Sequence, residues 1–255
     1  MQLRGAVSAA WLAAGLVLQA AVFTGCATTR DAAAPQAAAA ATTPATQPVP
    51  ALTKEAQAAM SPADALQRLK AGNARFVAGM ALPRDLRGQV TATAGGQYPY
   101  ASVLGCIDSR VPPELVFDQG IGDLFSARIA GNFVDPDILG SLEFASKLSG
   151  AKLILVLGHT GCGAIKGACD DVKLGNLTTT LAHLRPAVTA VRDVPGKRDS
   201  KNEEFVNAVT HMNVKLTLEA IRKQSPILDD LIARGELGLA GGVYDVKTGV
   251  VEFIE

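Results

Sequence analysis

Residues 152–158 (KLILVLG) constrain the fold of this chain most, because this run is almost continuously apolar over the length of one strand and ends in glycine. A strand with one face in solvent alternates apolar and polar residues, whereas a strand without alternation is buried on both faces. Strands of the second kind occur mostly in parallel sheets that helices cover on both sides. The segment therefore predicts an α/β fold.

The rest of the chain from residue 59 onward supports this fold class. Ser61 and Pro62 are typical of a helix start, and apolar residues follow at helical spacing. Further strands are predicted at 100–106 and 124–130, helices at 138–148, 178–193 and 203–224, and a hairpin of 237–244 with 250–254. Strands separated by helices imply right-handed crossovers. We expect a mainly parallel β-sheet with flanking helices and an antiparallel edge strand.

The first 26 residues are typical of an export signal. Arg4 precedes an apolar stretch at 9–23, and Thr24-Gly25-Cys26 follows it. A cysteine in this position resembles a bacterial lipobox, which predicts lipidation at Cys26 and a periplasmic location. Because Ala27 rather than aspartate follows, we expect anchoring in the outer membrane. The alternative is an uncleaved membrane helix, which needs about 20 apolar residues.

Residues 27–58 are rich in Ala, Thr, Pro and Gln and lack an apolar period, so they are predicted to be a linker. Residues 59–255 are long enough to form one domain with a sizeable core. The chain contains 24 basic and 24 acidic residues and is 48% hydrophobic. This balance excludes a disordered chain and argues against nucleic-acid binding, which needs a basic excess.

Chemistry-bearing residues follow two of the predicted strands. Cys106, Asp108 and Arg110 come after the first strand, and His159 and Cys162 come after the KLILVLG strand. Ligands gather at the carboxyl ends of parallel strands, so these groups can converge if the strands are neighbours. Two thiolates and one imidazole with an open fourth position are typical of catalytic zinc. Asp108 can either pair with Arg110 or fill the open position, so the two states compete.

Other interpretations of the cysteines stay open at this point. Cys106 and Cys162 can form a disulfide in an oxidising compartment, as in a redox or metal-binding lipoprotein without catalytic activity. A hydrolase with a nucleophilic cysteine is a further alternative, although no orienting carboxylate is evident. Cys169 is predicted to be a buried apolar residue.

The motifs CIDSR (106–110), HTGCG (159–163), ARIAGN (127–132) and GAIKGA (163–168) resemble those of the β-class carbonic anhydrases. The similarity spans residues 61–255. It implies that Cys106, His159 and Cys162 bind one Zn²⁺, that Asp108 and Arg110 form the catalytic dyad, and that Asp108 becomes a fourth zinc ligand in a closed form.

The resemblance also implies the substrate site and the partners. In the plant-like subtype, Gln97, Phe125, Phe144 and Gly163 match substrate-binding positions, although Phe144 replaces a frequent tyrosine. In the ARIAGN stretch, Ile129 replaces the usual asparagine. A homodimer or tetramer is expected, and residues 61–78 match the N-terminal helical arm that this resemblance implies.

The implied activity is reversible hydration of carbon dioxide to bicarbonate and a proton, by zinc-hydroxide attack. Zinc lowers the pKa of bound water to about 7, a value taken from a carbonic anhydrase with three histidine ligands and not worked out for this site. Hydrolysis of carbon disulfide or carbonyl sulfide on the same scaffold is the alternative substrate assignment.

Overall fold

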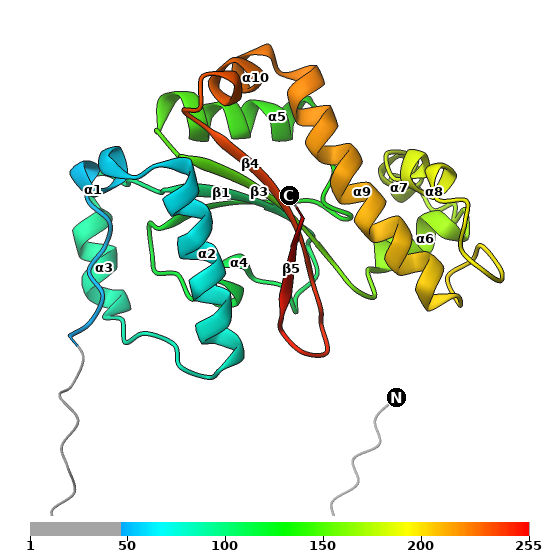
Figure 1. Ribbon diagram of the computed structural model, residues 1–255, viewed down its shortest axis with the longest axis horizontal. Coiled ribbons are helices and arrows are strands. Elements are labelled where there is room, and N and C mark those ends of the chain that lie inside the picture. The colour runs from blue at the N-terminus through cyan, green and yellow to red at the C-terminus, as the bar shows by residue number, and fades with distance from the viewer. Residues whose placement is uncertain (1–46, 255) are drawn as a thin grey trace, which may run out of the picture. The chain divides into compact units, whose positions relative to one another are not determined.

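The computed structural model describes residues 47–254, which contain a five-stranded sheet in the order β2-β1-β3-β4-β5. The strands are β1 (Ala101–Gly105), β2 (Leu124–Arg128), β3 (Leu153–His159), β4 (Gly238–Tyr244) and β5 (Val251–Ile254). The first four strands are parallel, and β5 runs antiparallel to β4 at one edge (Figure 1). The predicted α/β class, the central strands and the C-terminal hairpin are confirmed.

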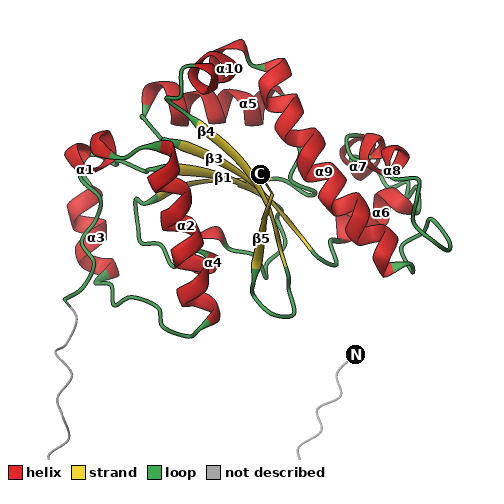
Figure 2. Cartoon of the chain, in the orientation of Figure 1, coloured by secondary structure: helices red, strands yellow, loops and turns green. Residues whose placement is uncertain are grey.

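Helices cover both faces of this sheet (Figure 2). They are α1 (Lys54–Ala59), α2 (Pro62–Val77), α3 (Leu86–Thr93), α4 (Pro113–Val116), α5 (Pro136–Glu143), the π-helix η1 (Phe144–Leu148), α6 (Gly163–Cys169), α7 (Leu177–Ala182), α8 (Arg185–Ala190), α9 (Glu203–Gln224) and α10 (Pro226–Ala233). Leu155 and Leu157 of β3 belong to the core beneath α2, whereas Ile154 and Val156 belong to the core beneath α5, α9 and α10. Burial on both faces explains why β3 is continuously apolar.

The predicted N-terminal helix begins as expected. The Ser61 hydroxyl accepts a hydrogen bond from the Asp64 backbone N–H, and the Asp64 carboxylate accepts one from the Ser61 N–H, which completes a capping box. Ala65 and Leu69 of α2 are fully buried in the core of the chain's own sheet. Helix α2 therefore packs on its own chain, and its expected role as an arm toward a second copy stays a prediction.

Two predicted boundaries are wrong. Residues 178–193 do not form one helix: α7 ends at Ala182 and α8 begins at Arg185, because Pro186 has no N–H to donate and favours a helix start. The linker expected at 27–58 also ends too late. Helix α1 lies within it, and the buried Gln57 amide donates to the carbonyls of Pro99 (2.7 Å) and Ser149 (2.8 Å).

Helix α9 lies unusually close to the sheet because two strands present glycines beneath it. A Cβ atom at Gly158 of β3 would lie 2.8 Å from Val214, and one at Gly241 of β4 would lie 2.7 Å from the same side chain. Val214 is fully buried in the hollow that these glycines leave.

Within residues 47–254, no helix is long and apolar enough to cross a membrane. The predicted signal and the predicted lipidation site at Cys26 lie outside the part of the chain that the structure describes.

Candidate active site

The two predicted clusters meet at one edge of the sheet. Strands β1 and β3 are parallel neighbours with Gly105 opposite Leu157, so Cys106 and His159 lie side by side at the carboxyl ends of these strands. Cys162 stands at the N-terminus of α6. The two sulfur atoms are 4.0 Å apart, and these sulfurs and a His159 nitrogen all lie within 4.8 Å of one another. Tetrahedral zinc with Zn–S bonds of about 2.3 Å would hold two sulfurs about 3.8 Å apart.

The environment of His159 fits a metal ligand. Its ring is fully buried, and Nδ1 lies 3.0 Å from the carbonyl oxygen of Thr160. A carbonyl accepts only, so Nδ1 carries the proton and Nε2 presents its lone pair. Nε2 has no hydrogen-bond partner. A buried polar atom without a partner is costly, and a cation between the two sulfurs would supply that partner.

The two thiols also favour a cation. The pKa of Cys106 is lowered, chiefly because the Cys162 thiol donates to its sulfur. The pKa of Cys162 is raised by the same neighbour and by burial. Negative charge on the Cys106 sulfur thus disfavours ionisation of the Cys162 thiol when no cation lies between them. A divalent ion stabilises both thiolates. Cys106 and Cys162 are free thiols, so the alternative of a disulfide is not observed.

Asp108 and Arg110 form a two-bond ion pair beside this ligand set. Arg110 Nε lies 2.9 Å from Asp108 Oδ1, and Nη2 lies 2.7 Å from Oδ2. These bonds lower the pKa of the Asp108 carboxyl well below its usual range. Asp108 Oδ2 is 3.8 Å from His159 Nε2, so the carboxylate borders the ligand set while it remains paired with Arg110.

Two residues of the ARIAGN stretch support Cys106, although the sequence assigned them no role. The Arg128 guanidinium donates to the backbone carbonyls of Cys106 (2.8 Å) and Asp108 (2.6 Å) and so holds the loop between them. The Gly131 N–H points at the Cys106 sulfur, 3.4 Å away. In the sequence, the one feature that could have pointed to Arg128 and Gly131 was their position in the ARIAGN motif.

Three predicted substrate-binding residues lie near the opposite, amino-terminal ends of the strands. Phe125 pairs in register with Ser102, near the start of β1, and the exposed Gln97 precedes that strand. Four residues at about 3.3 Å each separate this end of the sheet from Cys106 by about 13 Å. Within one chain, Gln97, Phe125 and Phe144 therefore lie away from the metal ligands, and their role in substrate binding stays a prediction.

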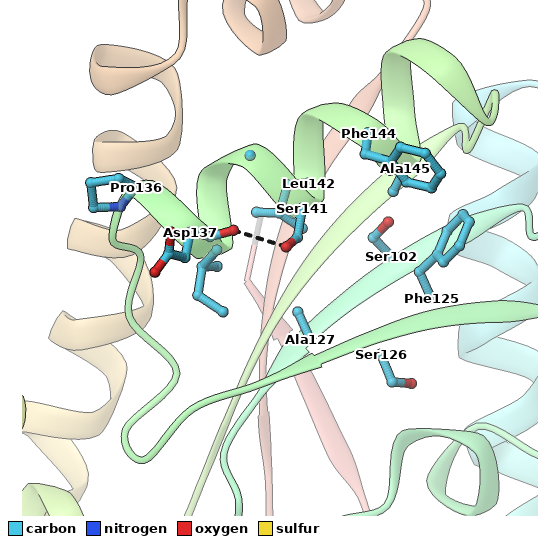
Figure 3. A pocket seen from close by; sticks show the side chains of 12 residues that line it. Ser102, Phe125, Ser126, Ala127, Pro136, Asp137, Ser141, Leu142, Phe144 and Ala145 are labelled. Carbon is cyan, nitrogen blue, oxygen red and sulfur yellow. Dashed lines mark hydrogen bonds between the residues drawn. The ribbon is translucent and has the colours of Figure 1, made fainter.

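Phe125 and Phe144 instead line a separate pocket of about 710 Å³ (Figure 3). Their rings meet edge to face with centroids 6.2 Å apart, and Ser102 lies beside them in Figure 3. Phe144 is 53% exposed. The fourth predicted residue, Gly163, begins α6 next to Cys162 and so stays at the metal edge.

Comparisons with known proteins agree with this geometry. The family model described as carbonic anhydrase matches residues 101–251. Carbonic anhydrase 2 of Mycobacterium tuberculosis is 37% identical over 196 residues, covering 74% of this chain and 91% of that protein.

Two fungal structures are also similar. The β-carbonic anhydrase CafA of Aspergillus fumigatus has a TM-score of 0.57 and 28% identity, covering 76% of this chain and 90% of that one. One of two tetrameric β-carbonic anhydrases from Sordaria macrospora has a TM-score of 0.56 and 27% identity, covering 64% of this chain and 84% of that one. With the Cys106–His159–Cys162 ligand set in place, this chain belongs to the β-class carbonic anhydrases.

Proposed function

We infer that this chain catalyses the reversible hydration of carbon dioxide to bicarbonate and a proton with one zinc ion. The observation that carries this conclusion is a buried set of three ligands with an aspartate–arginine pair at its border. Bound zinc acidifies water, so that attack on carbon dioxide is possible near neutral pH. A site used only for metal storage would need neither Asp108 nor Arg110.

Asp108 orients the attacking water. Its carboxylate stays ionised because Arg110 donates to both oxygens, and an ionised carboxylate only accepts hydrogen bonds. It therefore accepts a hydrogen bond from the water and directs the lone pair of the water oxygen at the substrate carbon. Arg110 also keeps Asp108 from entering the ligand set, which would close the site.

Stopped-flow measurement of carbon dioxide hydration from about pH 7 to about pH 9 tests this function on protein containing one zinc per chain. We expect activity that is lost in Cys106→Ala. Fully loaded protein without hydration activity would refute the assignment, and carbon disulfide assayed in parallel would reveal the alternative substrate class.

We propose that a second copy of the chain completes the substrate pocket. Gln97, Phe125 and Phe144 lie far from their own metal site, and Phe144 and Leu148 (76% exposed) leave an apolar surface uncovered. Tetrameric relatives from Sordaria macrospora support an assembly of this kind.

Complementation tests this arrangement. Cys106→Ala and Gln97→Ala chains are each expected to have little activity alone. In a mixed dimer one site regains both residues, so activity should return after the two variants are unfolded and refolded together. Absence of recovery in a mixture shown to contain heterodimers would contradict a shared site.

We also propose export, with lipidation at Cys26 and anchoring in the outer membrane. The basic Arg4, the apolar stretch at 9–23 and the Thr24-Gly25-Cys26 end support this proposal. Labelled palmitate should enter the full chain produced in a bacterial host and should not enter Cys26→Ser. Equal labelling of the two would contradict lipidation at this residue.

A further inference from the structure

A buried asparagine on α9 contacts the turn that supports the metal site. Asn213 is 3% exposed, and its Nδ2 donates to the Gly131 carbonyl at 2.8 Å, although 82 residues separate the two in sequence. Burial of an amide is unfavourable unless it is hydrogen-bonded, so Asn213 and Gly131 hold each other in place.

The turn at 129–132 needs such support. Ile129 N–H donates to the Gly105 carbonyl and continues the pairing of β1 with β2, and Asn132 N–H donates back to Ile129 at 2.9 Å. Gly131 has φ +88° and Asn132 has φ +44°. Glycine adopts such a φ without strain, whereas the side chain at position 132 makes this conformation unfavourable in isolation.

The turn is confined from two further directions. The Thr217 hydroxyl, one helical turn beyond Asn213, lies 3.5 Å from the Asn132 carbonyl. A Cβ atom at Gly131 would lie 2.7 Å from Leu184, which is fully buried. Helix α9 and Leu184 thus fix the orientation of the turn, in which the Gly131 N–H points toward the Cys106 sulfur 3.4 Å away.

We propose that Asn213 is a positioning residue for the zinc site, which acts through Gly131 to hold an N–H···S hydrogen bond on the Cys106 thiolate. This bond stabilises the sulfur lone pairs and reduces their donation to the metal. Reduced donation leaves the metal more positive. Loss of Asn213 lets the turn relax, so the sulfur loses its donor although all three metal ligands are still present.

Cobalt substitution tests this role because the sulfur-to-cobalt charge-transfer band reports directly on thiolate donation. Because the assigned role depends on the proposed zinc site, the readouts are this band and zinc affinity, both independent of hydration activity. In Asn213→Ala we expect the band to move to longer wavelength. Zinc affinity, measured by competition with a chromophoric chelator, should weaken about tenfold despite the stronger donation, because the relaxed turn no longer holds Cys106 in place for the metal.

Asn73→Ala is the matched control. Asn73 is another buried asparagine, and it donates to the carbonyls of Val116 and Gly249 away from the metal site. We expect this control to lower stability without moving the band. An unmoved band in folded Asn213→Ala would overturn the proposal, whether affinity is unchanged or falls only as much as in the control.

If Asn213→Ala does not fold, Thr217→Val decides. It removes the hydroxyl at the Asn132 carbonyl, and its control Thr210→Val removes a buried hydroxyl that bonds only within α9, to the Val206 carbonyl. A band shift toward longer wavelength in Thr217→Val alone supports the role of α9. Identical bands in these two variants would overturn it.

Discussion

Gly158 is the residue at which close packing and the metal site are most directly coupled, and Gly158→Ala is therefore an informative perturbation. It immediately precedes the zinc ligand His159 on β3, and α9 passes directly above it. A Cβ atom there would lie 2.8 Å from Val214 Cγ2 and 3.2 Å from Thr210 Cγ2. An ordinary carbon–carbon contact is about 3.5–4.0 Å, so α9 must move away by roughly 0.7 Å or more.

The expected magnitude follows from two opposing effects. Overpacking a well-filled core costs about 1–3 kcal/mol, whereas alanine recovers about 0.5–1 kcal/mol because it loses less backbone freedom than glycine on folding. Gly105→Ala shows the second effect alone, so the difference between Gly158→Ala and Gly105→Ala isolates the cost of overpacking. It occupies the corresponding end of β1, next to Cys106, and nothing lies within 4 Å of its added Cβ. The two variants should therefore differ by about 1–3 kcal/mol in the free energy of unfolding.

Urea unfolding at a fixed zinc concentration measures this difference, since bound metal stabilises the folded state by mass action. Val214→Ala removes the contacting methyl groups and should by itself cost about 2 kcal/mol. Combined with Gly158→Ala, it should cost about 1–2 kcal/mol less than the sum of the two single changes, because the clash is relieved.

Zinc affinity should fall in Gly158→Ala and not in Gly105→Ala, because a displaced α9 carries Asn213 away from Gly131. Equal stability of the Gly158→Ala and Gly105→Ala proteins, or strict additivity with Val214→Ala, would show that α9 does not rest on this glycine.

Four further outcomes are expected. Asp108→Asn should lower hydration at least tenfold with unchanged zinc content, as stopped-flow assays and metal analysis would show, because an amide cannot be held by Arg110 as an ionised acceptor. The pKa of Asp108 is lowered, so the stability that its ion pair contributes is fully present above the ordinary carboxyl pKa and is lost only as pH falls through the lowered value. The pH profile of kcat/KM should therefore show no ionisation of Asp108 between about pH 5 and pH 7. A fall in kcat/KM within this range that disappears in Asp108→Asn would contradict the pairing. Arg128→Met should destabilise the protein by about 2 kcal/mol in urea unfolding, because the carbonyls of Cys106 and Asp108 lose a charged donor, whereas a neutral effect would mean that water replaces it. After zinc is chelated, iodoacetamide at about pH 6 should label Cys106, because its pKa is lowered. It should spare Cys169, because burial raises the pKa of that thiol to about 11. Equal labelling of the two cysteines, measured by peptide mass mapping, would contradict the assigned ionisation.

Much of the fold and the metal ligands could be predicted because local patterns carry them. Continuous apolar character marks β3 as a strand buried on both faces, and strand ends mark the ligands at 106, 159 and 162. The break between α7 and α8 and the early start of the folded domain at α1 were missed. In the second case the deciding interaction is one buried amide, Gln57, bonded to residues 42 and 92 positions away.

Residue chemistry and position at the ends of predicted strands marked Cys106, His159 and Cys162 as candidate zinc ligands, and the family resemblance favoured zinc over the alternatives. The surroundings of these ligands depend on tertiary packing. It separates Phe125 from the metal by the length of a strand, and it brings Asn213 to Gly131 across 82 residues. It also shows that Gly158 is a glycine because Val214 rests on it. These relations depend on how distant elements pack in space, and no local period or spacing in the chain encodes them.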